Sequence, residues 1–490
     1  MNENMNERKA RLAGKFLIAG GIATFSVGCW GLWFDIGWIA QPFYAFAWWG
    51  YILVLDGFTA VRRGNSLLTT RYRYVPALLI WSVSFWYFFE LLNLRYQNWY
   101  YVGVYKNYYG RVVFSFVCFA TVMIGMFESY EALTATGIWK KLRKTPTQFP
   151  VWVSYAVQLV GLTMVTLSLV FPKYLAPLVW GSVSFLLDPI NYRRNSRSIL
   201  RDFEVRDYGM VLRFLLAGLI CGGFWESMNF FAPQKWIYTV RGLENFKLFE
   251  MPLLGFLGFP ALVLDGLTVY ALLARSFFNN QSWEHPDDLG YELPQTPSFS
   301  RTVFVWSIPV QILFAILVLQ GVWSVNIASE RLDLSDLSLL SAPSCEALEK
   351  EGIERPIQLL REAKDPERRE EIRGATGMET AQFNALLDEA GLLSFKGIGS
   401  RHGRLLQMAG IKRVDDLESQ EPEELQKQLA EFAQQNQIRP PRLDMVRVWG
   451  AGSTQPGDYH EERWKQNGRS DRCPAPQAGQ WLGDRKLNGN

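Results

Sequence analysis

Residues 75–101, VPALLIWSVSFWYFFELLNLRYQNWYY, decide the fold, because an apolar run leads here into Glu90-x-x-Asn93 and then into Trp99-x-Tyr101. About 20 mostly apolar residues in a helix span the ~30 Å hydrocarbon core of a bilayer. The same acid, asparagine, tryptophan and tyrosine return in the same order within 211–238, VLRFLLAGLICGGFWESMNFFAPQKWIY: Glu226, Asn229, Trp236 and Tyr238. The two stretches therefore predict membrane-spanning helices in a unit that occurs twice.

Matched residues on either side of these stretches extend the repeat. An aspartate, an arginine six residues later and a serine four residues after that occur in both copies: Asp56, Arg62 and Ser66, then Asp188, Arg194 and Ser198. A further acid, Glu128 or Asp265, lies 27 residues beyond each tyrosine. A four-helix unit returns the chain to its starting side. The sequence therefore predicts tandem repeats over about 16–133 and 151–274, related by an axis near the membrane normal and facing a shared cleft.

Composition separates a membrane part from an extramembrane part. Residues 1–325 contain 16 of the 19 tryptophans and 19 of the 20 tyrosines, which excludes a single soluble globule. Nine apolar stretches of spanning length are expected at 16–34, 42–61, 75–93, 112–133, 151–171, 175–192, 209–229, 251–274 and 302–324. We expect an all-α chain in which 1–325 is a polytopic transmembrane bundle with a ninth helix at 302–324. A linker at 326–343, a helical domain at 344–453 and a disordered tail at 454–490 are expected to follow.

The distribution of basic residues predicts the orientation. With the N-terminus in the cytoplasm, the cytoplasmic segments carry 19 Lys and Arg and the opposite loops carry 7. The positive-inside rule then places the N-terminus in the cytoplasm of a cell whose inner membrane holds the chain. An odd number of spans sends the C-terminal domain to the extracytoplasmic side.

The sequence contains no pattern that predicts a metal site or a cofactor-binding site. The three histidines, His285, His402 and His460, lie outside the apolar stretches, and the five cysteines form no Cys-x-x-Cys pair. No dinucleotide or nucleotide phosphate loop is present. We therefore expect no metal and no cofactor.

Polar residues within the apolar stretches form two predicted tiers. The outer tier places Glu90 and Glu226 as candidate acids, with Glu250 as a third, beside candidate ligand-cleft residues: Asn93, Trp99, Tyr101, Asn229, Trp236 and Tyr238. The inner tier comprises Asp56, Arg62, Glu128, Asp188, Arg194 and Asp265. A structural interpretation pairs the aspartates with the arginines and ties the helices together through Glu–Asn hydrogen bonds. A functional interpretation gives the acids a cationic or lipophilic ligand under an aromatic lid.

The segment 226–259 resembles the bacterial and archaeal membrane lycopene cyclases. The resemblance lies in Glu226, Trp236-x-Tyr238, Phe249-Glu250-Met251-Pro252 and Phe256-x-x-Phe259. It implies repeated helix units and intramembrane acids that protonate a polyene. The chain departs from that family in having Glu250 before the proline and Leu253-Leu254 after it, where the family carries paired acids.

The C-terminal domain contains a predicted helix-hairpin-helix at 395–410. Gly397 and Gly399 suit a tight hairpin, and Ser400 is expected to cap the following helix. Cationic side chains around the free N–H groups of that helix form a possible phosphate seat: Lys396, Arg401 and Arg404.

Residues 345–450 resemble a bacterial domain family of unknown function that is built from two helix-hairpin-helix units. The resemblance lies in 348–353, 374–377, the hairpin, 414–417 and the closing Pro441, Val446 and Trp449. Residues 345–450 hold 16 basic and 20 acidic residues, which disfavours general DNA binding. We expect a protein partner or self-association instead, with DNA as the alternative.

Three functions remain open at this point. The leading hypothesis is a membrane-anchored binding or interaction protein, with the bilayer and a small or lipophilic ligand as partners. The alternatives are an intramembrane acid-catalysed cyclase and a transporter that works at the repeat interface.

Overall fold

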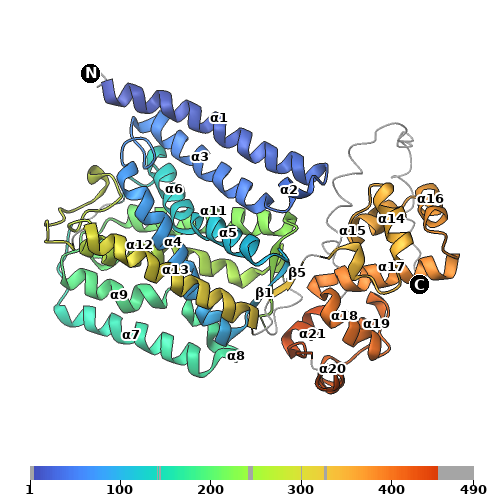
Figure 1. Cartoon of the computed structure of the whole chain (residues 1–490). Coiled ribbons are helices and arrows are strands. Elements are labelled where there is room, and N and C mark those ends of the chain that lie inside the picture. Colours follow the sequence, from blue (N-terminus) through green and yellow to red (C-terminus); the bar gives the residue numbers. More distant parts are fainter. Residues whose placement is uncertain are drawn as a thin grey trace, which may run out of the picture.

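The computed structural model describes residues 5–140, 142, 145–240, 247–299, 301–324, 328–330, 332–436 and 438–450. Helices dominate these residues, and the all-α class is confirmed. The tail expected at 454–490 lies outside the described residues. Figure 1 shows a bundle of long helices and, beyond one of its ends, a separate group of shorter helices at the C-terminal end of the described chain.

The bundle is built from long helices joined by short ones and by short strands. Its helices are α1 (Met5–Trp33), α2 (Gly37–Ala40), α3 (Phe43–Arg63), α4 (Val75–Tyr96), α5 (Tyr108–Phe119), α6 (Thr121–Thr136), α7 (Val151–Val170), α8 (Pro172–Leu175), α9 (Ser182–Arg193), α10 (Ile199–Glu204), α11 (Tyr208–Phe231), α12 (Gly258–Phe277) and α13 (Arg301–Ser324). Its 3-10 turns are η1 (Tyr72–Tyr74), η2 (Ala176–Val179), η3 (Leu253–Leu257) and η4 (Pro286–Asp288).

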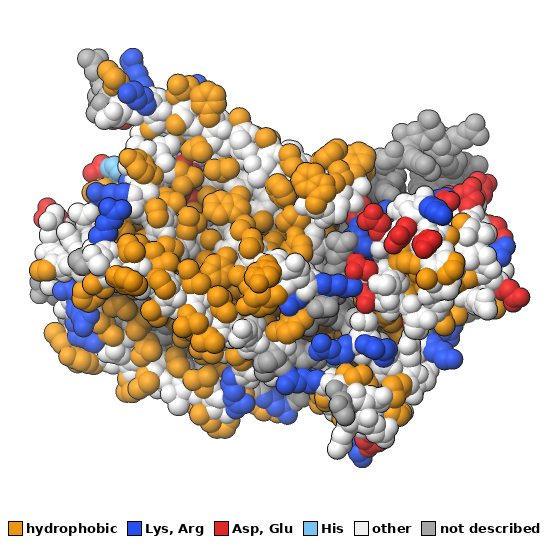
Figure 2. Space-filling model, viewed as in Figure 1, with side chains coloured by type: hydrophobic (Ala, Val, Ile, Leu, Met, Phe, Trp, Pro, Cys, Tyr) orange, Lys and Arg blue, Asp and Glu red, His pale blue; other side chains and the backbone are white. Residues whose placement is uncertain are grey.

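Eight helical segments among the described residues are long and apolar enough to cross a membrane. They correspond to eight of the nine expected stretches, and α1, α7 and α13 present most of their side chains outward. Apolar side chains accordingly cover much of the bundle surface in Figure 2. The expectation of a continuous helix over 175–192 is wrong, because α8, η2 and α9 divide this stretch. Pro177 lies in η2 and Gly181 adopts φ +86°, which a continuing helix does not tolerate.

Glycines set the close packing of α1 on α3. A Cβ atom at Gly21 would lie 2.7 Å from the carbonyl oxygen of Gly50, and one at Gly57 would lie 2.6 Å from that of Gly14. These four glycines are spaced by seven residues on each helix, so they share one face along the contact. Without a hydrophobic driving force in lipid, such close backbone approach supplies van der Waals contact between spanning helices.

Short strands gather at the end of the bundle that is nearer the C-terminal domain. Strand β1 (Trp99–Val104) pairs antiparallel with β2 (Lys235–Tyr238) and parallel with β5 (Ala328–Glu330), while β3 (Lys247–Leu248) pairs with β4 (Met251–Pro252). The segment expected as a linker, 326–343, thus contributes β5 and the turn η5 (Leu334–Asp336). This segment joins the bundle edge to the C-terminal domain.

The C-terminal domain has a helical core of its own. Its elements are α14 (Ala342–Lys350), α15 (Pro356–Glu362), α16 (Pro366–Thr376), α17 (Thr380–Ser394), η6 (Phe395–Gly397), α18 (Gly399–Met408), α19 (Val414–Glu418), α20 (Pro422–Gln435) and α21 (Leu443–Gly450). Leu386, Leu405 and Leu429 are fully buried in it. Strand residues Tyr100 and Ile237 belong to the same apolar cluster, so the core of this domain continues into the strands of the bundle.

The glycine contact between α1 and α3 gives a direct test of the bundle. We expect Gly21→Leu to lower the thermal midpoint of the detergent-purified protein, because overpacking a close helix contact costs about 1–3 kcal/mol. The adjacent Gly20 faces outward with no atom near an added Cβ, so Gly20→Leu is the matched control and should leave the midpoint unchanged. Equal midpoints for the two variants would contradict the packing described here.

Candidate functional site

Glu90 lies near the strand end of α4 and is 1 % exposed. Its Oε1 accepts hydrogen bonds from the indole N–H of Trp86 at 2.9 Å, the indole N–H of Trp99 at 3.1 Å and the hydroxyl of Tyr101 at 2.5 Å. Trp86 lies one turn earlier on the helix, and Trp99 and Tyr101 share one face of β1 because strand side chains alternate. The Trp-x-Tyr spacing therefore brings two donors down onto one carboxyl oxygen.

Glu226 occupies the matching position on α11 and is fully buried. Its Oε1 accepts a hydrogen bond from the hydroxyl of Tyr238 on β2 at 2.8 Å. The other oxygen of each acid, Glu90 Oε2 and Glu226 Oε2, is buried and has no hydrogen-bond partner within the described part of the chain. Each acid thus retains one buried oxygen that is free to accept or to carry a proton.

The two asparagines fold the strands back over the acids. Asn93 donates from Nδ2 to the carbonyl of Trp99 at 3.0 Å and accepts from the amide of Asn98 at 2.9 Å. Asn229 donates to the carbonyl of Trp236 and accepts from its amide, both at 3.0 Å. The sequence interpretation in which Glu bonds directly to Asn is not what these contacts show, because each asparagine side chain is occupied by backbone groups of the following strand.

Strands β1 and β2 pair so that equivalent residues cross. Trp99 lies opposite Tyr238 and Tyr101 lies opposite Trp236, with Tyr100 opposite Ile237 between them. Antiparallel pairing with this register has a local twofold axis at its centre. It brings the two glutamates' aromatic partners into one small sheet.

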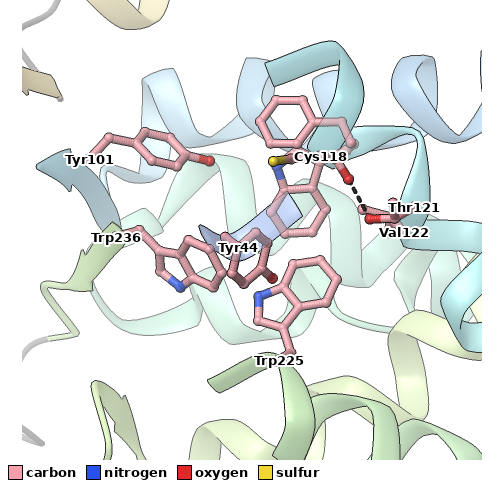
Figure 3. A pocket seen from close by; sticks show the side chains of 9 residues that line it. Tyr44, Tyr101, Cys118, Thr121, Val122, Trp225 and Trp236 are labelled. Carbon is pink, nitrogen blue, oxygen red and sulfur yellow. Dashed lines mark hydrogen bonds between the residues drawn. The ribbon is translucent and has the colours of Figure 1, made fainter. Parts of the chain in front are cut away.

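A small cavity lies beneath this sheet (Figure 3). It is lined by aromatic and small polar side chains from both halves of the bundle: Tyr44, Trp86, Tyr101, Cys118, Phe119, Thr121, Val122, Trp225 and Trp236. In Figure 3, Tyr101 and Trp236 enter from the strands and Trp225 from α11. The space available to the centre of a water-sized sphere is about 20 Å³, which is roughly one water molecule. The cavity therefore has room for one small polar group in this conformation.

Glu250 is placed apart from this cavity. Its Oε1 forms an ion pair with the Nζ of Lys235 at 2.6 Å, and both side chains are partly exposed. None of the three acids lines the cavity itself, but Glu90 is bonded to two residues that do, Trp86 and Tyr101. Of the three candidate acids, Glu90 and Glu226 are each bonded to a tyrosine of the paired strands β1 and β2, whereas Glu250 is paired with Lys235.

The inner tier corrects the expected Asp–Arg pairs. Arg62 and Arg194 are exposed, and neither aspartate is bonded to them. Asp56 accepts from the hydroxyl of Ser66 at 2.7 Å and the amide of Leu68 at 2.8 Å. Asp188 accepts from three donors at 2.9 Å, namely the hydroxyl of Ser198 and the amides of Ile199 and Leu200. The physical reason is the chain turn after each helix, which returns a serine and its neighbours to the buried carboxylate while the arginines reach water.

The remaining inner acid of the second half is also held by donors. Asp265 on α12 accepts from the amides of Gly181 at 2.9 Å and Ser184 at 2.7 Å, and from the hydroxyl of Ser184 at 2.7 Å. Asp265 therefore holds the break between η2 and α9 in place.

Two buried ion clusters escaped the sequence analysis. Arg197 pairs with Glu284 at 2.6 Å and Asp202 at 2.7 Å, all three at most 2 % exposed, and Arg71 pairs with Glu131 at 2.5 Å. Burial raises the pKa of Asp202 to about 7, and the Arg197 charge opposes that rise. Arg71 and Glu131 are 60 residues apart in the sequence, and Arg197 and Glu284 are 87 apart, so no local spacing predicts these two pairs.

The predicted hairpin of the C-terminal domain faces the membrane bundle. Its backbone adopts positive φ at Lys396 (41°), Gly397 (73°) and Gly399 (68°), as the tight turn requires. The carbonyl of Lys396 accepts the hydroxyl of Tyr100 on β1 at 2.7 Å, and its Nζ donates to the carbonyl of Val448 at 3.0 Å. The Lys396 part of the expected phosphate seat is thus packed on the bundle.

The helix after the hairpin differs at its start from the expectation. The N-cap is Ile398 and α18 begins at Gly399, so Ser400 lies inside the first turn and its expected capping role is wrong. The positive φ of Gly399 lets the helix begin immediately after the turn. Arg401 and Arg404 are exposed on α18.

Further polar contacts dock the C-terminal domain on the bundle. Arg442 donates to the carbonyl of Gln97 at 3.0 Å and to its side chain at 2.9 Å, and burial lowers the pKa of Arg442 to about 10. Gln358 donates to Asp35 at the end of α1 at 2.6 Å, and Arg355 forms an ion pair with the same carboxylate. These contacts tie the domain to α1 and to the α4–β1 junction.

Comparison with known proteins identifies only the C-terminal region. Residues 340–452 match a family described as a domain of unknown function (DUF4332). No curated protein and no solved structure matches the chain. The match covers α14 to α21, so it agrees with the resemblance of residues 345–450 to a domain family of unknown function, and it does not extend to the bundle.

His402 makes the stability of the C-terminal domain depend on pH. It is 3 % exposed beside the ring of Trp449, and burial together with the charge of Arg401 lowers the pKa of His402 from 6.5 to about 4. Below pH 6.5 the unfolded chain binds a proton that the folded domain refuses until about pH 4. We expect the domain to lose about 2 kcal/mol between pH 7 and pH 5, measured in the full chain by hydrogen exchange of the α17–α18 amides.

Two variants control this measurement. His402→Phe should keep the ring contact and remove that part of the pH dependence, whereas His285→Gln in the distant η4 region should retain it. A pH dependence unchanged in His402→Phe would show that His402 is not its source.

Proposed function

We propose that the chain is a membrane-anchored binding protein in which one strand connects an intramembrane acid and aromatic site to the C-terminal domain. The observation that carries this proposal is the alternation of side chains along β1. Tyr101 on one face donates to Glu90 above the cavity, whereas Tyr100 on the other face donates to Lys396 of the hairpin. A ligand that moves β1 therefore also moves the contact with the C-terminal domain.

The ligand class is inferred from the aromatic lining of the cavity and from the two acids bonded to the strands beside it. Each acid has one buried oxygen without a partner in the described part of the chain, which favours a group that donates hydrogen bonds or is cationic, and the rings of the lining favour a cation or an apolar neighbour. The space fits a hydroxyl or amine and not a whole hydrophobic molecule. We propose a lipophilic ligand whose small polar head enters between Glu90 and Glu226 while its apolar part lies toward the bilayer.

We further propose that the bundle is a tandem duplication, with units near 16–133 and 151–274. Matched contacts support it: a Ser66-type serine binds each helix-end aspartate, an asparagine binds each Trp-x-Tyr strand, and a tyrosine binds each glutamate. The crossed register of β1 and β2 is what a twofold axis between two copies would produce.

For the C-terminal domain we propose two helix-hairpin-helix units and a protein partner or self-association. The hairpin at Lys396 is bonded to Tyr100 and the domain is net acidic, and both features disfavour duplex DNA as the ligand. An intramembrane cyclase would use the same glutamates as proton donors, and a transporter would pass its substrate along the interface between the halves.

The binding proposal is tested by what the purified protein carries. We expect solvent extracts of the protein purified in mild detergent to contain a lipophilic compound by mass spectrometry, and Glu90→Gln/Glu226→Gln to lose most of it. Glu250→Gln is the matched control, because this acid is paired with Lys235 outside the cavity. Identical extracts from all three proteins would reject the site. A ring-closed product made by wild type alone would favour the cyclase, and flux in proteoliposomes would favour the transporter.

The proposed orientation is an inner-membrane chain with a cytoplasmic N-terminus and an extracytoplasmic C-terminal domain. It rests on the loop charges and on the bundle crossing nine times, with α8, η2 and α9 together forming the sixth crossing. Reporters that are active only outside the cytoplasm should be active when fused after Asn490 and inactive when inserted at Asn195 in the basic loop. Activity at Asn195 and silence after Asn490 would invert the topology.

A further inference from the structure

The acid Glu128 on α6 differs from every other inner-tier acid in its surroundings. It is fully buried in a spanning segment, and no donor approaches either of its carboxyl oxygens among the described residues. The matched acid of the other half, Asp265, has three donors. A buried carboxylate without donors costs several kcal/mol, so an ionised Glu128 is the least stable form here.

The neighbour that Glu128 does reach is another carboxyl group. Helix α6 packs along α3, and across this contact the carboxyl group of Glu128 interacts with that of Asp56, which is also fully buried. Ser66 and Leu68 already supply Asp56 with a hydroxyl and an amide donor, as a carboxylate requires. A hydrogen bond between two carboxyl groups needs one proton, and the donors on Asp56 place that proton on Glu128.

The cations nearby are committed elsewhere. Arg71 binds both oxygens of Glu131, one turn along α6 from Glu128, at 2.7 and 2.5 Å. The residue after Glu128 on α6, Ser129, is bonded to Tyr51 of α3 at 2.7 Å and neighbours Cys221 of α11. Asp56, Glu128, Glu131 and Arg71 together would carry two net negative charges if all were ionised, and one after Glu128 binds a proton.

We propose that Glu128 and Asp56 form a proton-binding site inside the membrane bundle, with the ligand being a single proton shared in the bond Glu128 Oε–H···Oδ Asp56. The site stands apart from the outer cavity and is independent of the binding function proposed above. Because Ser66 and Leu68 lie in the turn between α3 and η1, the charge on Asp56 also holds that turn. The shared proton therefore sets the charge of the Glu128–Asp56 pair, and this charge governs how strongly Asp56 binds the turn after α3.

Infrared spectroscopy of the full-length protein in nanodiscs tests the site. We expect a protonated carboxyl C=O band in wild type at neutral pH that shifts in D₂O and is absent from Glu128→Gln and Glu128→Met. The use of two removal variants guards against one that does not insert. Asp188→Asn is the matched control and should keep the band, since Asp188 is a carboxylate with three donors. If the band remains in both Glu128 variants, the proposal is wrong.

Stability supplies the second readout. Glu128→Gln keeps an N–H that donates to Asp56, so it should unfold near the wild-type midpoint at neutral pH. Raising the pH should destabilise wild type relative to Glu128→Gln, because the unfolded chain releases a proton that the folded chain retains. The ratio of their unfolding equilibrium constants should change by up to ~10-fold per pH unit. Parallel pH profiles for the two proteins would show that Glu128 is ionised and would sink the proposal.

Discussion

Carboxyl groups inside the bundle need hydrogen-bond donors that lipid cannot supply, and the chain meets this need with its own helix ends. Asp188 on α9 accepts hydrogen bonds from the Ser198 hydroxyl and from the next two amides, and so holds the following turn against the helix. Asp265 fastens the break at Gly181 from α12. Each acid thereby fixes a turn that apolar packing alone would leave undefined. The irregular parts of the bundle are organised around charges, whereas the long helices are organised around glycine and aromatic contacts.

The same requirement produces the sheet at the end of the bundle. Glu90 takes donors from alternate residues of β1, which commits Trp99 and Tyr101 to the inner face and leaves Tyr100 on the outer face. The two edges of β1 then pair with β2 and with β5. Docking of the C-terminal domain is in this sense a consequence of how a buried acid is satisfied, because the strand that binds Lys396 has its orientation set by Glu90.

Sequence reasoning predicted the long helices but not the contacts between distant segments. Length and apolarity predicted nine spanning stretches, and eight of them correspond to spanning-length helical segments in the described residues, since each such helix satisfies its own backbone regardless of its neighbours. The prediction of a continuous helix over 175–192 was wrong, because it relied on apolar composition and gave too little weight to Pro177 and Gly181, where the helix is broken. Arg62 was assigned to Asp56 on sequence proximity, although the serine ten residues after Asp56 was the partner. Glu284 gave no local signal, because Arg197 lies 87 residues before it.

The two outer acids differ in their hydrogen-bond donors, and the residue four positions before each acid explains how. Trp86, four residues before Glu90, donates its indole N–H to that acid. The residue four before Glu226 is Gly222, and a Cβ there would lie 2.2 Å from the ring of Phe259. A phenylalanine ring therefore fills the space where the first half places a donor. Because a phenyl ring cannot donate, Glu226 receives less stabilisation of its anion than Glu90 from this direction. Glu90 on α4 therefore has an indole donor within its own helix, whereas Glu226 on α11 depends on donors from the strand that follows it.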